Sequence, residues 1–139
     1  MHKIIVSFVT GLSLFGLIGL TQAAGKVSPV TVDGAKSVSA AEAKALFDKG
    51  AIFVDTRKSK DWDAGRIPDA IHLDVKKVFS EETLGKEVKK GDAVVMYCNG
   101  ESCLRSSKAS KMAVGWGYSN VYYFRDGFPA WKAAGYPVE

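Results

Sequence analysis

Two cysteines five positions apart are the strongest candidates for chemistry in this sequence. Cys98 directly follows the apolar run 93–97, and Cys103 lies inside the polar segment that Cys98 begins. A cysteine between a buried strand and a helix faces inward-pointing backbone N–H groups and the positive end of the helix dipole. Such surroundings favour thiolate over thiol and make the sulfur nucleophilic without a general base. We therefore predict Cys98 as a catalytic nucleophile.

The segment after Cys98 suits an anion-binding loop. Gly100 can adopt a positive φ, which lets the backbone curl around the sulfur. Arg105, separated from Cys98 by six residues, can add fixed positive charge at the rim. We predict Arg105 as a second catalytic residue, and the backbone N–H groups of the loop as donors to an anionic substrate. The predicted substrate-binding residues of the loop are Asn99, Gly100, Glu101, Ser102, Cys103 and Leu104.

Three roles are open for Cys103. It can resolve an oxidised or sulfur-loaded Cys98 by forming a disulfide, it can be a structural partner that locks the loop, or it can be a bystander. A disulfide requires Cα atoms within roughly 7 Å, which a curled loop with this spacing permits. A persistent disulfide would block Cys98, so activity would then require a thiol reductant as partner.

The elements that must position this loop alternate between strands and helices. Short apolar runs at 51–55, 70–73, 93–97 and 121–124 are typical of strands buried on both faces. Helices are predicted at 40–49, where Ser39 and Glu42 form a capping box, and at 80–89, 105–114 and 128–134. This alternation predicts an α/β fold with a central, mostly parallel sheet flanked by helices on both faces. Ligands bind such sheets at the carboxyl ends of the strands, where Cys98 is placed.

Motifs on either side of this loop resemble those of the rhodanese-like family. The first comprises Asp55-Thr56-Arg57, then Asp61-Trp62, then residues 65–71, and the last comprises residues 126–131 and 135–138. With the strand, cysteine loop and helix between them, the resemblance covers residues 37–139. It implies a rhodanese fold with Cys98 as the nucleophile.

The resemblance also implies an activity. Family members typically take sulfane sulfur from thiosulfate or a similar small anionic donor, hold it as a cysteine persulfide and pass it to an acceptor such as cyanide or a thiol. It implies neither a metal nor an organic cofactor, and it places Arg57 at the anion pocket. The sequence departs from the family in loop length, because six residues separate Cys98 from Arg105 where the common loop has two fewer.

Other functions remain open beside sulfur transfer. Cys98 and Cys103 together also fit a thiol-disulfide or polysulfide-handling redox protein. Arsenate reductase or phosphatase chemistry goes with a longer loop in this superfamily, although Tyr97 stands where those phosphatases usually carry His. A non-catalytic binding module is the remaining hypothesis.

The N-terminus has the layout of a secretory signal peptide. Lys3 precedes an uncharged apolar run over 4–20, and small residues follow, so we predict a signal peptide over 1–23. A leader over 24–36, either loose or an edge strand, and one domain over 37–139 complete the predicted organisation. We expect a periplasmic or secreted protein that meets the membrane only through its signal peptide. The net charge of +4 suits small anionic substrates and is too weak to indicate nucleic-acid binding.

Overall fold

A five-stranded, entirely parallel sheet forms the centre of the computed structural model, which describes residues 27–139. The predicted signal peptide over 1–23 lies outside the described residues. The strand order is β1-β5-β4-β2-β3, so β4, which leads to Cys98, occupies the middle of the sheet. The strands are β1 (Lys36–Ser37), β2 (Ile52–Asp55), β3 (Ile71–His72), β4 (Val94–Tyr97) and β5 (Val121–Phe124).

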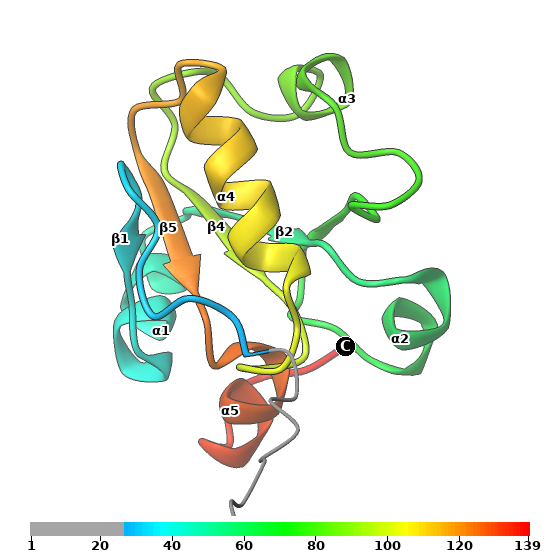
Figure 1. The fold of residues 1–139 in the computed structure, drawn as a ribbon. Coiled ribbons are helices and arrows are strands. Elements are labelled where there is room, and N and C mark those ends of the chain that lie inside the picture. Colours follow the sequence, from blue (N-terminus) through cyan, green and yellow to red (C-terminus); the bar gives the residue numbers. More distant parts are fainter. Residues whose placement is uncertain (1–26) are drawn as a thin grey trace, which may run out of the picture.

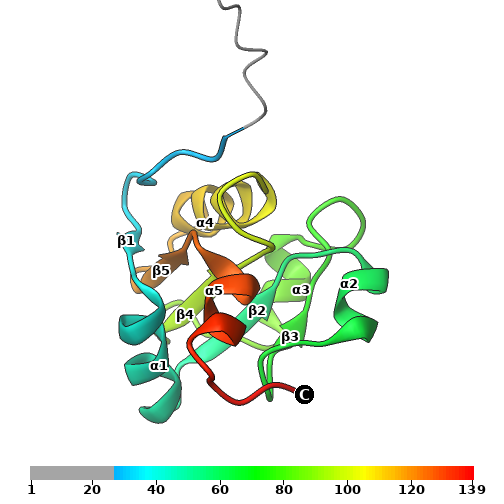
Figure 2. The ribbon, with the colours of Figure 1, turned by 90° about the horizontal axis from the view of Figure 1, so that it is seen from below.

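Helices cover both faces of the sheet, as predicted (Figures 1 and 2). Helix α4 packs with the α3 segment on one face, whereas α1 and α5 lie together on the other. Helix α2 lies beside β3 and buries none of its residues. The helices are α1 (Ala40–Asp48), α2 (Ser59–Ala64), α3 (Glu81–Gly85), α4 (Arg105–Gly115) and α5 (Gly127–Ala133).

Strand β4 shows why these runs are apolar throughout. All four of its residues are buried, with Val94 and Met96 facing the core under α4, and Val95 and Tyr97 facing the core under α5. Successive side chains of a strand point to opposite faces, so a strand covered on both sides needs apolar residues at every position. Packing on both faces of β4 therefore fixes the position of the residue that follows it, Cys98.

The predicted elements differ from the structure at their ends. The capping box of Ser39 and Glu42 is present and starts α1 at Ala40, as expected. The helix predicted over 80–89 is wrong in extent, because α3 ends at Gly85, a residue that disfavours a helix interior. Helix α2 was not predicted, since it has no buried stripe that would give a periodic apolar pattern.

The segment before the sheet is tied to the domain rather than loose. Lys36 and Ser37 pair with β5 as an edge strand, which confirms that part of the expectation. The idea of a loose leader is wrong for the described residues ahead of it, because Ser28 is buried and bonds to the loop that follows β4. Among residues 27–139, no helix is long and apolar enough to cross a membrane.

Candidate active site at the carboxyl edge of the sheet

Cys98 lies at the carboxyl end of β4, fully buried, and the loop after it leads into α4. Its sulfur forms a disulfide with Cys103, with the two Cα atoms 6.3 Å apart. Cys103 is partly exposed, unlike Cys98. The loop therefore curls as predicted. Of the three roles open for Cys103, the disulfide fits the two in which it bonds to Cys98 and not the bystander. In this state neither sulfur is a free nucleophile.

The loop backbone offers several free donors close to Cys98. Gly100 has φ 110°, and its carbonyl accepts the amide N–H of Cys103 at 3.0 Å. The next N–H groups lead into α4, an eleven-residue helix whose dipole adds positive potential. Free backbone N–H groups in a turn before a helix are suited to binding an anion. No hydrogen bond within residues 27–139 uses the N–H groups of Asn99, Gly100, Glu101, Ser102 or Leu104.

The first two residues of helix α5 pack against the start of the loop. The N–H of Phe128 donates to the carbonyl of Cys98 at 2.8 Å. Gly127 has φ 61°, and a Cβ there would collide with that carbonyl oxygen and lie 3.0 Å from the nitrogen of Gly100. Only glycine allows the two backbones to approach this closely.

Gly127→Ala is expected to lower the free energy of unfolding by about 1–3 kcal/mol, because the added methyl group must displace loop backbone. The measurement is urea unfolding of the reduced protein. Gly135→Ala is the matched control, since Gly135 has φ 76° but a Cβ there meets nothing within 4 Å. Equal losses in the two variants would show that the positive φ, and not the contact with the loop, sets the cost.

Arg57 forms hydrogen bonds that hold the start of the loop. Its Nε and Nη2 donate to both carboxylate oxygens of Asp55 at 2.7–3.1 Å, and both residues are buried. Its Nη1 donates to the side-chain oxygen of Asn99 at 3.1 Å, and its Nη2 also donates to the carbonyl of Gly65. The guanidinium therefore joins the ends of β2 and β4, and most of its donors are occupied by protein groups.

The charge of Asp55 dominates its buried surroundings. Burial opposes the charge of Arg57, but the hydrogen bond and negative charge of Asp55 outweigh it and raise the pKa of Arg57. Tyr97 donates its hydroxyl to Asp55 at 2.8 Å, and burial together with this neighbouring charge raises the pKa of Tyr97. Tyr97 and Arg57 thus remain a neutral phenol and a cation, both held by one carboxylate.

Arg105 points toward a carboxylate instead of over the loop. Its Nη1 lies 2.6 Å from Oδ1 of Asp74 and 3.3 Å from the carbonyl oxygen of Thr56. Asp74 is itself buried, and its Oδ2 has no hydrogen-bond partner within residues 27–139. The side chain predicted for the rim of the anion site therefore connects the first turn of α4 to the segments that follow β2 and β3.

Asp74→Asn is expected to destabilise the protein by about 1.5–3 kcal/mol at pH 7, since it removes a charged acceptor from a nearly buried pair. Burial raises the pKa of Asp74, but the N–H of Lys76 and the Arg105 guanidinium outweigh it and lower that pKa. A lowered folded-state pKa stabilises the protein above the unfolded pKa of about 3.9, and this contribution disappears as the pH falls.

Urea unfolding from pH 7 down to pH 3 checks this prediction, because the gap between the wild type and Asp74→Asn should narrow as the wild-type carboxylate is protonated. Asp63→Asn serves as the control, since Asp63 is exposed on α2 and forms no ion pair within the described residues. A gap that stays constant over this range would argue against the ion pair as its source.

Two site neighbours escaped the sequence analysis. Ser28 donates its N–H and its hydroxyl to the carbonyl of Glu101, each at 2.7 Å. Arg125 donates to the hydroxyl and carbonyl oxygens of Ser28 at 3.2 and 3.0 Å, and lies 3.5 Å from the carboxylate of Glu101. The contacts of Ser28 join positions more than 70 residues apart, which no local pattern signals. The middle of the loop is thus anchored to the N-terminal segment and to the end of β5.

His72 takes no part in this loop. It lies in β3, its Nε2 is 2.7 Å from the carbonyl oxygen of Arg57, and its ring stacks on Trp62 with centroids 4.8 Å apart. Within residues 27–139 there is no group of three or more His, Cys, Asp and Glu side chains that could hold a metal ion. The chemistry available here is that of a buried sulfur in a loop with free backbone N–H groups.

Comparisons with known proteins agree with this geometry. A family model, "Rhodanese-like domain", matches residues 39–134. The thiosulfate sulfurtransferase GlpE of Pseudomonas savastanoi pv. phaseolicola is 34% identical over 108 residues, covering 75% of this chain and 92% of that protein. The crystal structure of BH2092 protein from Bacillus halodurans matches with a TM-score of 0.67 and 26% identity, covering 76% of this chain and 77% of the other. The human single-domain sulfurtransferase TSTD1 shares the fold, with a TM-score of 0.60, 22% identity, and coverage of 71% and 96%.

Proposed function

Because this chain belongs to the rhodanese-like domain family, we propose that it is a sulfurtransferase that carries sulfane sulfur as a persulfide on Cys98. The fold expected from the resemblance is confirmed, and sulfurtransferases are among the relatives at family level. Thiosulfate or a similar small anion is the proposed donor, since the relative from Pseudomonas savastanoi is a thiosulfate sulfurtransferase. Cyanide or a thiol is the proposed acceptor.

The observation that carries this proposal is the position of Cys98 at the end of the buried central strand, directly before a loop whose amides have no partner within residues 27–139 and which leads into α4. A persulfide, like thiosulfate, is anionic, and N–H groups without other partners can stabilise both. In the first step the Cys98 thiolate attacks the outer sulfur of thiosulfate, the S–S bond of the donor breaks, and sulfite leaves with the bonding electrons. In the second step the acceptor attacks the outer sulfur of the persulfide and Cys98 leaves as the thiolate.

The two arginines have supporting roles in this proposal. Arg57 holds Asn99, the first residue after the nucleophile, through the bond from Nη1. Arg105 holds the first turn of α4 through its ion pair with Asp74. Both are positioning residues for the backbone donors.

Intact mass spectrometry of the reduced protein tests the proposal. Incubation with thiosulfate should add one sulfur atom, and later addition of cyanide should remove it and release thiocyanate. The starting protein is reduced and freed of reductant, because the disulfide to Cys103 blocks Cys98. If fully reduced protein gains no sulfur from thiosulfate, thiosulfate is not the donor. If a polysulfide also leaves no sulfur on the reduced protein, the proposed persulfide on Cys98 is wrong.

A second function is favoured by the disulfide itself. Cys98 and Cys103 are already bonded, and a fully buried sulfur paired with a partly exposed one is an arrangement that thiol-disulfide exchange can use. In that function the protein handles disulfides or polysulfides as a redox carrier. Turnover with thiosulfate and cyanide in the presence of a reductant would favour sulfur transfer over this alternative.

Export is part of the same proposal. The predicted signal peptide over 1–23 would deliver the protein to the periplasm or the exterior, where disulfides persist. Cys98 would then depend on a thiol reductant in that compartment. Fractionation of cells that express the full chain, with N-terminal sequencing of the product, tests whether cleavage after Ala23 takes place.

A further inference from the structure

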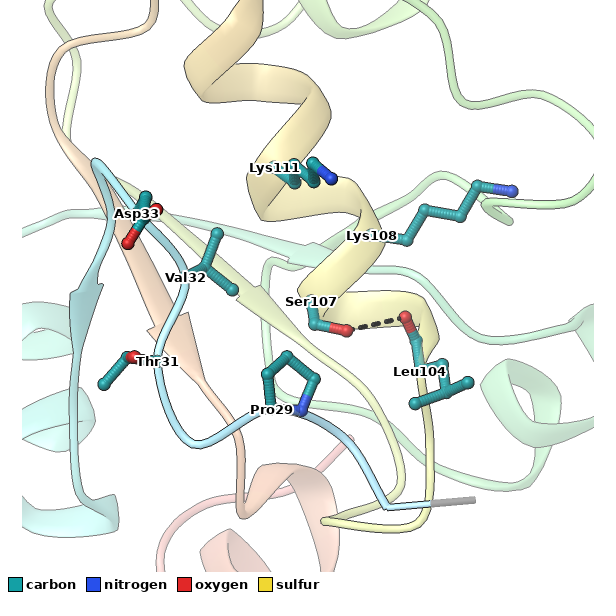
Figure 3. A pocket seen from close by; sticks show the side chains of 8 residues that line it. All are labelled: Pro29, Thr31, Val32, Asp33, Leu104, Ser107, Lys108 and Lys111. Carbon is teal, nitrogen blue, oxygen red and sulfur yellow. Dashed lines mark hydrogen bonds between the residues drawn. The ribbon is translucent and has the colours of Figure 1, made fainter.

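An open pocket of about 520 Å³ lies between the N-terminal segment and the first half of α4 (Figure 3). Pro29 and Val32 face it from the segment, and Leu104 closes it beside the active loop. Leu104 directly follows Cys103, so one residue of the pocket wall is the chain neighbour of the disulfide. The remaining lining residues are Thr31, Asp33, Ser107, Lys108 and Lys111.

Apolar exposure is concentrated in the two segments that line this pocket. Of the five exposed large apolar residues within 27–139, three belong to the N-terminal segment or the active loop, namely Val27, Val30 and Leu104, with 65%, 68% and 39% of their surface exposed. An exposed apolar patch with a polar rim is typical of a surface that binds another molecule. Leu104, the residue after Cys103, brings this surface next to the disulfide in the chain.

The rim of the pocket carries positive charge that the protein leaves free. Lys108 and Lys111 are exposed on α4, and neither ammonium group forms an ion pair or hydrogen bond within residues 27–139. Asp33 is the acidic residue on the opposite wall. Two free cations beside an apolar wall favour a partner segment that combines an apolar side chain with acidic ones.

We propose that this pocket is the docking site of a protein dithiol whose attacking cysteine is flanked by apolar and acidic residues, and that this partner reduces the disulfide by attack on Cys103. The inference rests on the proposed function, since that function requires Cys98 as a free thiolate. Cys103 is the sulfur to be attacked because Cys98 is fully buried, whereas Cys103 is partly exposed and directly precedes Leu104 of the pocket wall.

The exchange is balanced by the two thiols of the partner. The first partner thiolate bonds to the sulfur of Cys103, the Cys98–Cys103 bond breaks, and Cys98 leaves as a thiolate beneath the loop amides. The second partner thiol then attacks the mixed disulfide, and Cys103 leaves and takes up a proton. The partner is oxidised to a disulfide and this protein gains two electrons. A leaving thiolate stabilised by N–H donors speeds the first step.

Two synthetic peptides test the docking surface on the oxidised full chain. Each carries one cysteine and one leucine, and they differ in having two glutamates or two lysines. Mass spectrometry follows the rate at which each peptide forms a mixed disulfide with the protein. Each rate is divided by the rate at which the same peptide reacts with a small uncharged disulfide, because this removes differences in thiol reactivity between the peptides. The glutamate peptide should react about tenfold faster at low salt, with less preference at high salt. Peptide mapping should place the adduct on Cys103.

Variants at the pocket separate docking from general charge. Lys108→Gln/Lys111→Gln should abolish the preference for the glutamate peptide. Lys49→Gln/Lys89→Gln, which removes two exposed lysines at the opposite edge of the sheet, should retain it. Equal normalised rates for the two peptides, an adduct on Cys98, or an unchanged preference in the pocket variant would each overturn the proposal. The proposal would also be overturned if the protein were a dimer and either peptide reacted only after dilution had dissociated it. A second copy of this chain would then occupy the pocket.

Sulfur loading is measured in parallel on chemically reduced protein, so that the two proposals can fail separately. Suppose that thiosulfate adds sulfur to the reduced pocket variant, but the wild type shows no preference between the peptides. The docking proposal alone would then be wrong. A glutamate preference without any sulfur adduct from thiosulfate or polysulfide would remove the sulfurtransferase and leave a dithiol-dependent redox protein.

Discussion

Replacing Cys98 by Ser is expected to lower the rate of sulfur transfer from thiosulfate to cyanide by at least about a thousandfold. A serine hydroxyl in the same place is a far weaker nucleophile than a thiolate and forms no persulfide. The rate of thiocyanate formation with reduced protein is the measurement. Mass spectrometry should show no added sulfur in this variant.

Cys103→Ser is the matched control, because both variants lose the same disulfide. The loop that it closes is short, so each should lose a similar unfolding free energy of about 2 kcal/mol. Cys103→Ser should keep sulfur transfer and no longer need a reductant. If Cys103→Ser also loses turnover while sulfur accumulates on Cys98, Cys103 resolves the persulfide and the redox function gains support. Transfer that survives in Cys98→Ser would place the nucleophile elsewhere.

The parts of the fold that follow from local pattern were predictable. The apolar run before Cys98 predicted β4, because a strand covered on both faces needs apolar residues at every position. The capping box at Ser39 and Glu42 gave the start of α1. Helix α2 and the true end of α3 were missed, since short helices with few buried residues are stabilised by neighbouring segments and leave little periodic signal.

The active site divides in the same way. Strand, cysteine and helix lie next to each other in sequence, so the loop around Cys98 could be placed from sequence. The partner of Arg105 could not, because Asp74 reaches it through the packing of β3 against β2, and a sequence shows only that Arg105 is positive. Ser28 and Arg125 meet Glu101 for a similar reason. The spacing of the cysteines left their bond undecided, since five positions permit a disulfide without requiring one.

Asp55→Asn is expected to cost about 3–5 kcal/mol of unfolding free energy, the largest stability effect among the predicted variants. The asparagine has nearly the shape of the aspartate but no charge, so the buried guanidinium of Arg57 loses its counter-ion. Tyr97 also loses its charged acceptor. Since Arg57 holds Asn99 at the start of the loop, sulfur transfer should fall as well. Urea unfolding at pH 7 and thiocyanate formation are the two measurements.

The physical cause of this cost can be isolated with further variants. Asp55→Leu/Arg57→Met removes both charges and should recover part of the lost stability, because replacing a whole buried pair costs less than leaving one charge alone. Asp48→Asn breaks the exposed pair with Lys44 and should change the unfolding free energy by less than about 1 kcal/mol. A loss below about 1 kcal/mol in Asp55→Asn, or no recovery in the double variant, would mean that the unpaired charge of Arg57 is not the source of the cost. Recovery of stability without recovery of sulfur transfer would separate the two tasks of Arg57, since methionine can fill the space but cannot hold Asn99.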